Sequence, residues 1–230
     1  MVGKFLEWLA NARGLGVTPQ VLDIGCGPGR MFSAFRKLGW AVSSMEPDPE
    51  FLELAAQAAR DAGYAPPAPG GFLELDTSAS YDLVTAINDP FAYLLTGSER
   101  ADAAARVFRA LRSGGAFFLD VPNFTWILKN YREPAEMRAE IQGGEVRLMR
   151  EHIIDFHGAV FTTIERYRVV KDGMERASSM THPFAMTTFP EIAYHLESAG
   201  FRDLETYSSY EARAVESLDG PRLMISARRP

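Results

Sequence analysis

Three alternating glycines follow an apolar run near the start of this chain, and a carboxylate precedes them. Residues 21–30 read VLDIGCGPGR, with Asp23 upstream of Gly25, Gly27 and Gly29. Glycine permits a sharp turn and the close approach of a ligand, because it lacks Cβ and tolerates a positive φ. The pattern predicts a loop that holds a ligand at the N-terminus of the next helix; a tight turn without a ligand is the alternative.

A second carboxylate, Glu46, ends the next apolar run, in the segment SMEPDPEF. Sheets built from alternating strands and helices place an acid there to accept hydrogen bonds from ribose hydroxyls, and a solvated loop carboxylate is the alternative. The dinucleotide fingerprint Gly-x-Gly-x-x-Gly does not fit, since Arg30 stands where its third glycine would fall. No Gly-Lys-Ser/Thr follows, which excludes a nucleoside triphosphate loop.

Further candidate residues fall into two groups: one follows the apolar run near residues 81–87, and the other consists of histidines in the second half of the chain. The segment Asn88-Asp89-Pro90-Phe91 would lie at the mouth of the sheet, where open α/β folds bind ligands; a plain Asx-Pro turn is the alternative. Tyr93 could reach a substrate or pack within the next helix. His152 and His182 lie on predicted strands that could cover the site, and a structural role is the alternative for each.

The remaining reactive side chains are expected to be structural. His157 fits a turn and His195 lies inside a predicted amphipathic helix. No second ligand accompanies any histidine at metal-binding spacing, so no metal site is predicted. Cys26 lies at a helix start, which could lower the pKa of its thiol. We nevertheless expect Cys26 to serve only as a small side chain that fits the loop, and not as a nucleophile.

Strands and helices must alternate to position these residues. Apolar spacing predicts helices over Lys4–Arg13, Met31–Leu38, Pro49–Ala62, Ala101–Leu111 and Phe189–Ala199. Short apolar runs predict strands over Gln20–Ile24, Trp40–Met45, Gly71–Leu75, Tyr81–Asn88, Ala116–Val121, Arg202–Tyr210 and Leu223–Arg229. The Pro-rich stretch Tyr64–Gly71 reads as a surface loop. This alternation predicts a parallel sheet with helices on both faces, its last two strands paired antiparallel.

The pattern changes between residues 145 and 186, where strands follow one another without helices. Turns at Phe156–Ala159 and at Lys171-Asp172-Gly173 predict a three-stranded antiparallel insert. We therefore expect a main domain from residues 1–144 and 187–230, with residues 145–186 as a small β insert that covers a substrate or pairs its edges in a homodimer.

Composition limits the function further. The chain has 230 residues and a net charge of -6, which suits one globular domain and disfavours nucleic acid as a partner. It has neither a long apolar run nor the apolar stretch of a signal peptide, so no membrane segment is expected. A single cysteine fits a reducing, cytoplasmic location.

These features together resemble the class I S-adenosylmethionine-dependent methyltransferases. The motif Asp23-x-Gly25-x-Gly27-x-Gly29 and Glu46 carry the resemblance, with support from three later segments: Tyr81–Val84, Arg112–Ala116 and Ser198–Phe201. The insert is similar to that of the small-molecule branch, which includes glycine N-methyltransferase and sugar N,N-dimethyltransferases. The resemblance implies a Rossmann-like sheet of seven strands in the order 3-2-1-4-5-7-6, strand seven being antiparallel.

The resemblance also implies a role for each residue of the cofactor site. The loop from Gly25 to Gly29, Cys26 included, would pack against the methionine part of S-adenosylmethionine, and Asp23 would help to hold the loop and the amino group. Glu46 would bind the ribose hydroxyls, with Pro47 against the adenine.

Three further positions complete the implied site. Asp76 or its rival Glu74 would lie near the adenine amino group, and Asn88 and Phe91 follow strand four at the cofactor. The product would be S-adenosylhomocysteine.

The chemistry implied is an in-line methyl transfer to a small-molecule N or O acceptor, in which proximity and orientation carry most of the effect. Tyr93 and His182 are the catalytic candidates. The absence of a clear general base favours an amine or a pre-ionised oxygen as acceptor. The alternatives are a non-catalytic S-adenosylmethionine-binding regulatory protein and an NAD(P)-dependent reductase.

Overall fold

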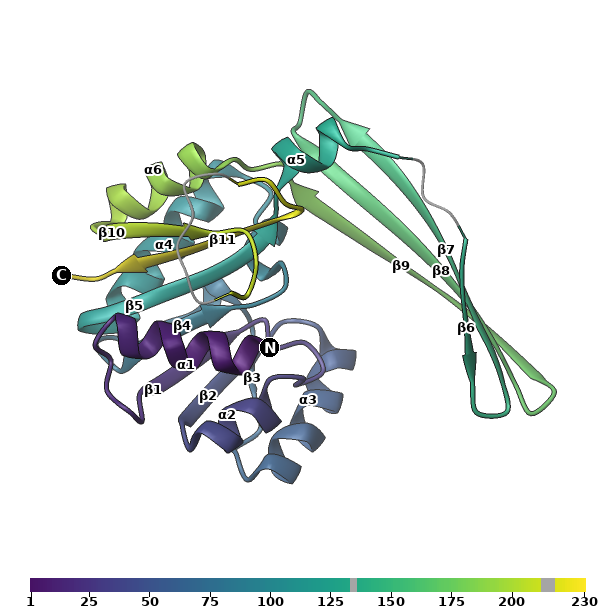
Figure 1. The fold of residues 1–230 in the computed structure, drawn as a ribbon, viewed down its shortest axis with the longest axis horizontal. Coiled ribbons are helices and arrows are strands. Elements are labelled where there is room, and N and C mark those ends of the chain that lie inside the picture. Colours follow the sequence, from purple (N-terminus) through teal and green to yellow (C-terminus); the bar gives the residue numbers. More distant parts are fainter. Residues whose placement is uncertain (133–135, 212–217) are drawn as a thin grey trace.

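Two β-sheets organise the chain in a computed structural model that describes residues 1–132, 136–211 and 218–230 (Figure 1). The larger sheet has the strand order β10-β11-β5-β4-β1-β2-β3. Its strands are β1 (Gln20–Ile24), β2 (Ala41–Glu46), β3 (Ala68–Pro69), β4 (Tyr81–Ala86), β5 (Leu111–Pro122), β10 (Arg202–Tyr207) and β11 (Arg222–Arg228). All neighbours are parallel except β11, which runs antiparallel to β5 and β10, and this confirms the predicted strand order.

Helices cover both faces of the larger sheet. The sheet and these helices together are called the body below. One face packs against α1 (Val2–Ala12), α2 (Phe32–Leu38) and α3 (Pro49–Ala62). The other packs against α4 (Gly97–Ala110) and α6 (Phe189–Ala199). Local sequence sets the helix ends: the Asp48 side chain accepts from two backbone N–H groups of α3, and Gly63 ends that helix in the left-handed conformation. None of the described helices is long and apolar enough to cross a membrane.

The predicted third strand is wrong in its position. The strand that pairs with the outer edge of β2 is β3, at Ala68–Pro69, while Phe72–Glu74 forms a 3₁₀ turn, η1, where the sequence predicts a strand over Gly71–Leu75. The Glu74 side chain folds back to accept from the Gly71 N–H at 2.8 Å, which holds the turn. Pro69 has no N–H to donate, and it is tolerated because β3 is the edge strand.

The second sheet, called the arm below, projects from the body between α5 (Phe124–Lys129) and α6 (Figure 1). It contains β6 (Met137–Ile141), β7 (Gly144–Asp155), β8 (Val160–Lys171) and β9 (Met174–Ala185), in that order and antiparallel. The sequence predicts three strands, and the structure adds β6. This strand is short and wholly exposed, so burial does not mark it; the alternation of Met137, Ala139 and Ile141 is the signal that could have revealed it.

The arm has an inner and an outer face, which the strand register defines. Phe161 and Phe184 lie opposite each other on the inner face, where Phe161 packs on Phe124 of α5 and Phe184 on Tyr93, with ring centroids 5.3 and 4.9 Å apart. Side chains of alternate residues lie on the outer face, where Met149 and Ile153 are 53% and 58% exposed. The inner face therefore meets the body at the base of the arm.

Candidate functional site

The glycine loop follows β1 and turns back against the end of β2. The N–H groups of Gly25 and Cys26 donate to the Met45 carbonyl at 2.9 and 3.1 Å. Gly25 has a φ of 69°, and a Cβ at this residue would lie 2.6 Å from Cβ of Pro90. Glycine is therefore required here by conformation and by space, and the loop packs directly against the segment that follows β4. Nothing lies within 4 Å of the corresponding position at Gly27, which leaves that side of the loop open.

Glu46 ties the glycine loop to the end of β2. The buried carboxylate accepts from the Gly27 N–H at 2.7 Å through Oε2 and from the Asp48 N–H at 2.9 Å through Oε1. Burial raises the pKa of Glu46, and these two hydrogen bonds oppose the rise. The carboxylate of Glu46 therefore lies at the carboxyl edge of the parallel strands, beside the loop.

Asp23 lies behind the loop and is 2% exposed. The Thr85 hydroxyl donates to its Oδ1 at 2.7 Å. Burial raises the pKa of Asp23 to about 7, the Thr85 hydrogen bond opposes this rise, and the nearby Glu46 carboxylate adds to it. Asp23 is therefore a buried acid of β1 that is tied to β4 through Thr85.

Cys26 is buried within the loop and is not an activated thiol. Burial, together with the carboxylates of Asp23 and Glu46, raises the pKa of the Cys26 thiol to about 12. The position at a helix start could have lowered this pKa, but the environment acts the other way.

The adenine-side candidates lie at or near the turn η1. Pro47 is exposed and lies next to Gly71. Of the two rival acids, Glu74 holds the Gly71 N–H and Asp76 is exposed.

The segment after β4 contributes a strained turn. Asn88 and Asp89 both adopt left-handed φ values, 66° and 82°, although neither is glycine. Asn88 is exposed, while Phe91 is fully buried and packs edge-on against Phe72 at 5.5 Å. Phe91 therefore lies in the core beneath the site.

Tyr93 and His182 meet across the junction of body and arm. The Tyr93 hydroxyl lies 2.6 Å from Nδ1 of His182, although the first belongs to the short turn η2 (Pro90–Tyr93) and the second to β9. Burial raises the pKa of Tyr93 to about 12, and the carboxylates of Asp89 and Glu165 act in the same direction. The two catalytic candidates thus form one hydrogen-bonded pair.

The other histidines lie elsewhere. His152 packs on Phe161 on the inner face of the arm, with ring centroids 4.7 Å apart. His157 is in an exposed turn, and His195 lies in α6. Burial lowers the pKa of His195, as expected for a structural histidine. Within residues 1–132, 136–211 and 218–230, no group of three His, Cys, Asp or Glu side chains is placed to hold a metal ion.

A buried charged cluster at this edge of the sheet is not evident from the sequence. Arg222 forms ion pairs with Asp89, at 2.7 Å, and with Asp120. Tyr210 donates to the other oxygen of Asp120. Burial raises the pKa of Asp89, and the charge of Arg222 opposes the rise. These residues are far apart in the chain, so only the fold reveals the cluster.

Comparison with known families finds a match for part of the body. Residues 21–115 match the family described as a methyltransferase domain. This segment is a methyltransferase domain. A protein of Geobacillus sp. strain WCH70 that is named as a methyltransferase is 29% identical over 103 residues, and the match covers 44% of this chain and 42% of that protein.

Solved structures of methyltransferases share the fold of the whole chain, arm included. A S-adenosylmethionine-dependent methyltransferase from Clostridium acetobutylicum ATCC 824 aligns with a TM-score of 0.81 at 16% identity, over 99% of this chain and 90% of that one. The S-adenosylmethionine-bound amino pentose methyltransferase from Micromonospora echinaspora aligns with a TM-score of 0.78 at 22% identity, over 99% and 90%. The chain therefore has the class I methyltransferase fold.

Proposed function

We propose that this methyltransferase domain transfers a methyl group from S-adenosylmethionine to the nitrogen or oxygen of a small molecule. One observation carries the proposal: the glycine loop and Glu46 lie at the same edge of the larger sheet as Tyr93, which forms the hydrogen-bonded pair with His182 of the arm. The match to the methyltransferase family supports the donor, and the fold shared with an amino pentose methyltransferase supports a small acceptor.

The residues of the loop suit the cofactor. The open side of Gly27 leaves room for the methionine part, and Glu46 stands at the strand end where a ribose would bring two hydroxyls. Pro47 would cover one face of the adenine, and Asn88 would lie beside the methionine part. The bound cofactor would supply a methyl group already activated on a sulfonium.

The acceptor would enter between the loop and the base of the arm. Its lone pair forms the bond to the methyl carbon as the carbon–sulfur bond breaks, and the sulfur leaves as a neutral thioether. The Tyr93–His182 pair would orient the acceptor and could take its proton. Holding donor and acceptor in line supplies most of the rate enhancement.

Calorimetry tests the cofactor site. We expect S-adenosylhomocysteine to bind the purified protein and NADH not to bind. Replacing Glu46 with Gln should weaken S-adenosylhomocysteine by about tenfold or more, because two ribose hydrogen bonds to a charged acceptor are lost. Equal affinity of the E46Q variant would contradict the proposed site.

Turnover tests the chemistry. A panel of small amines and alcohols, including amino sugars, is incubated with S-adenosylmethionine and scanned for methylated products by mass spectrometry. For an amine acceptor we expect Y93F and H182A to slow turnover while leaving S-adenosylhomocysteine binding unchanged. Binding without any methylated product would instead indicate a regulatory protein.

A second copy of this chain is the proposed partner of the outer face of the arm. Three arginines form a row across β6, β7 and β8, and three acids form a parallel row beside it: Arg138, Arg147 and Arg168, then Glu140, Glu145 and Glu175. A two-fold axis between the rows would set the arginines of one copy over the acids of the other.

Sedimentation tests this partner. We expect the wild-type protein to be a dimer, R147E and E145R each to be monomeric, and an equal mixture of the two variants to recover a dimer. A monomeric wild-type protein would contradict the proposal.

We also propose a cytoplasmic location for this protein. The single cysteine, Cys26, is a buried free thiol, which suits a reducing compartment.

A further inference from the structure

One acid of the arm differs from all the others in its position. Glu165 lies on the inner face, opposite Arg150 of β7 and Met180 of β9. By register, every other Asp or Glu within β6, β7, β8 and β9 lies on the outer face. The Glu165 side chain is 13% exposed, whereas that of Glu151 on the outer face is 54% exposed. An acid at this position is not explained by solubility.

Glu165 is held in place and kept ionised. Arg150 donates to Oε1 through Nε and Nη2, at 2.8 and 2.6 Å, and the Tyr167 hydroxyl donates to Oε2 at 2.5 Å. Burial alone would raise the pKa of Glu165, but these hydrogen bonds and the charge of Arg150 bring it below its usual value. The carboxylate of Glu165 is therefore ionised and fixed in position within an ion pair with Arg150.

The register places this charge beside the catalytic candidates. Glu165 pairs with Met180, and His182 pairs with Thr163, so Glu165 and His182 are diagonal neighbours on the inner face. Such neighbours are about 7–8 Å apart, within reach of long side chains. His182 in turn contacts Tyr93 of the body.

Asp89 approaches the same pair from the body. It begins the turn that ends at Tyr93, and its backbone is fixed by the Asp120 carbonyl, which accepts from the Asp89 N–H at 2.9 Å. Arg222 is shared between Asp89 and Asp120, so this cluster keeps an excess of one negative charge. A carboxylate from the arm and one from the segment after β4 therefore lie near Tyr93 and His182.

We propose that Glu165 and Asp89 bind the positively charged amine of the acceptor, and that Glu165 makes the arm a specificity-determining part of the site. This inference rests on the proposed function and narrows its acceptor to a basic amine. The bound ammonium gives its proton to His182, and the freed lone pair then forms the bond to the methyl carbon as the carbon–sulfur bond breaks. The same carboxylates stabilise the imidazolium that results.

Sinefungin provides a probe that needs no knowledge of the acceptor. In this analogue of S-adenosylmethionine a carbon bearing a primary amine replaces the methylsulfonium, so a cation points from the cofactor site towards the acceptor. S-adenosylhomocysteine lacks this amine and serves as the reference. The measured quantity is the ratio of the two dissociation constants at pH 7.5, by calorimetry.

We expect the preference for sinefungin over S-adenosylhomocysteine to fall by about fivefold or more in E165Q, because a charge-assisted interaction is lost. The matched control is E151Q, which removes an acid of the outer face that lies 2.7 Å from Arg166. It should leave the ratio unchanged. D89N should lower the ratio as E165Q does, and thermal melting checks that each variant is folded.

An unchanged ratio in a folded E165Q would overturn the inference, whether both affinities stay as they were or both weaken equally. Equal weakening would indicate a purely structural role for Glu165. If the wild-type protein binds neither ligand, the proposed function itself fails, and this outcome is distinguishable from the other two.

Discussion

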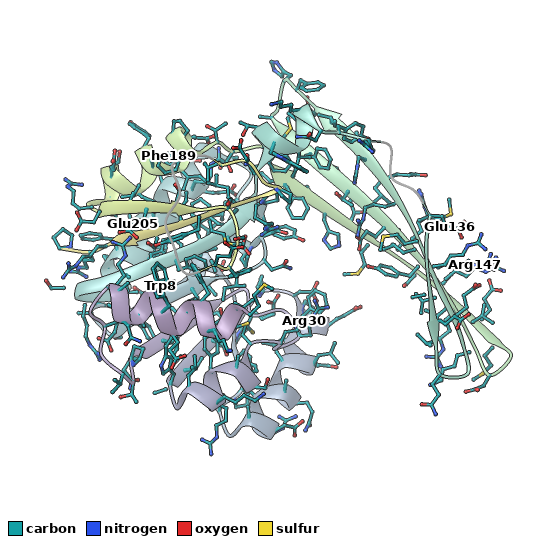
Figure 2. The ribbon with its side chains drawn as sticks, viewed as in Figure 1. Trp8, Arg30, Glu136, Arg147, Phe189 and Glu205 are labelled. Carbon is teal, nitrogen blue, oxygen red and sulfur yellow. The ribbon has the colours of Figure 1, made fainter. Side chains whose placement is uncertain are left out.

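The two sheets of this chain are stabilised in different ways. In the body, neighbouring residues of β5 point to opposite faces and both are buried, as Phe117 and Phe118 are, each 0% exposed. In the arm, the three strands of 12 residues extend away from the helices of the body (Figure 2), and Met149 and Ile153 on the outer face remain largely exposed. Burial therefore stabilises the body, while the arm depends on its hydrogen-bonded ladder and on what covers it.

Removing one apolar side chain from each sheet should give the largest contrast. F118A is expected to lower the free energy of unfolding by about 3–5 kcal/mol, because it leaves a cavity in a closed core. I153A in the arm should cost less than about 0.5 kcal/mol. Urea unfolding of both variants measures the contrast, and similar losses would show that the arm is already covered in solution.

Within the body, the contact between the glycine loop and the segment after β4 should be nearly as sensitive to substitution. G25A adds a Cβ 2.6 Å from Pro90 at a left-handed φ and should cost about 3 kcal/mol, with loss of S-adenosylhomocysteine binding. The control is G39A, where φ is 70° but nothing lies within 4 Å. It should cost about 1 kcal/mol and leave binding unchanged. Equal effects of the two variants would mean that strain alone, and not the contact with Pro90, fixes the loop.

The buried charge of the body should make stability depend on pH. Asp23 has a folded pKa of about 7, above its ordinary value of 3.8, so the folded state holds this proton more tightly and the free energy of unfolding falls as pH rises through this interval. D23N should raise the free energy of unfolding by about 2 kcal/mol at pH 8.5 and change it little near pH 4. Urea unfolding at both pH values is the measurement, and the same gain at each pH would contradict the prediction.

The exposed charges of the arm should give the smallest effect. Glu175 lies 2.7 Å from Arg168, but both side chains are largely in solvent. E175Q should leave the midpoint of thermal unfolding unchanged at dilute, monomeric concentration, because water screens such pairs. A clear loss there would show that the ladder of ion pairs, and not the backbone hydrogen bonds, holds the arm together.

The sequence predicts the body well because its signals are local. Gln20–Ile24, Pro49–Ala62 and Phe189–Ala199 form as predicted, since an apolar run, a capping aspartate or a terminal glycine marks each end. The third strand and β6 were misplaced or missed. Both are short edge strands with almost no burial, and periodicity says little about such segments.

The residues of the candidate site likewise fall into those that the sequence predicts and those that only the fold reveals. The loop from Gly25 to Gly29 and Glu46 are recognisable because their spacing is fixed within one strand–helix–strand unit. The contact between Tyr93 and His182, and the placing of Glu165 beside them, depend on how the arm meets the body. No sequence pattern within a single segment predicts the contact between the arm and the body, so only the tertiary structure shows it.

The two sheets share no strand, and the arm leaves and re-enters the body between β5 and α6. Nothing in the hydrogen-bonded ladder of the donor site thus depends on the strands that carry Glu165 and His182. If the proposed function holds, the arm could be exchanged for another one to change which acceptor is bound, while the part of the body that would bind the cofactor stays unchanged.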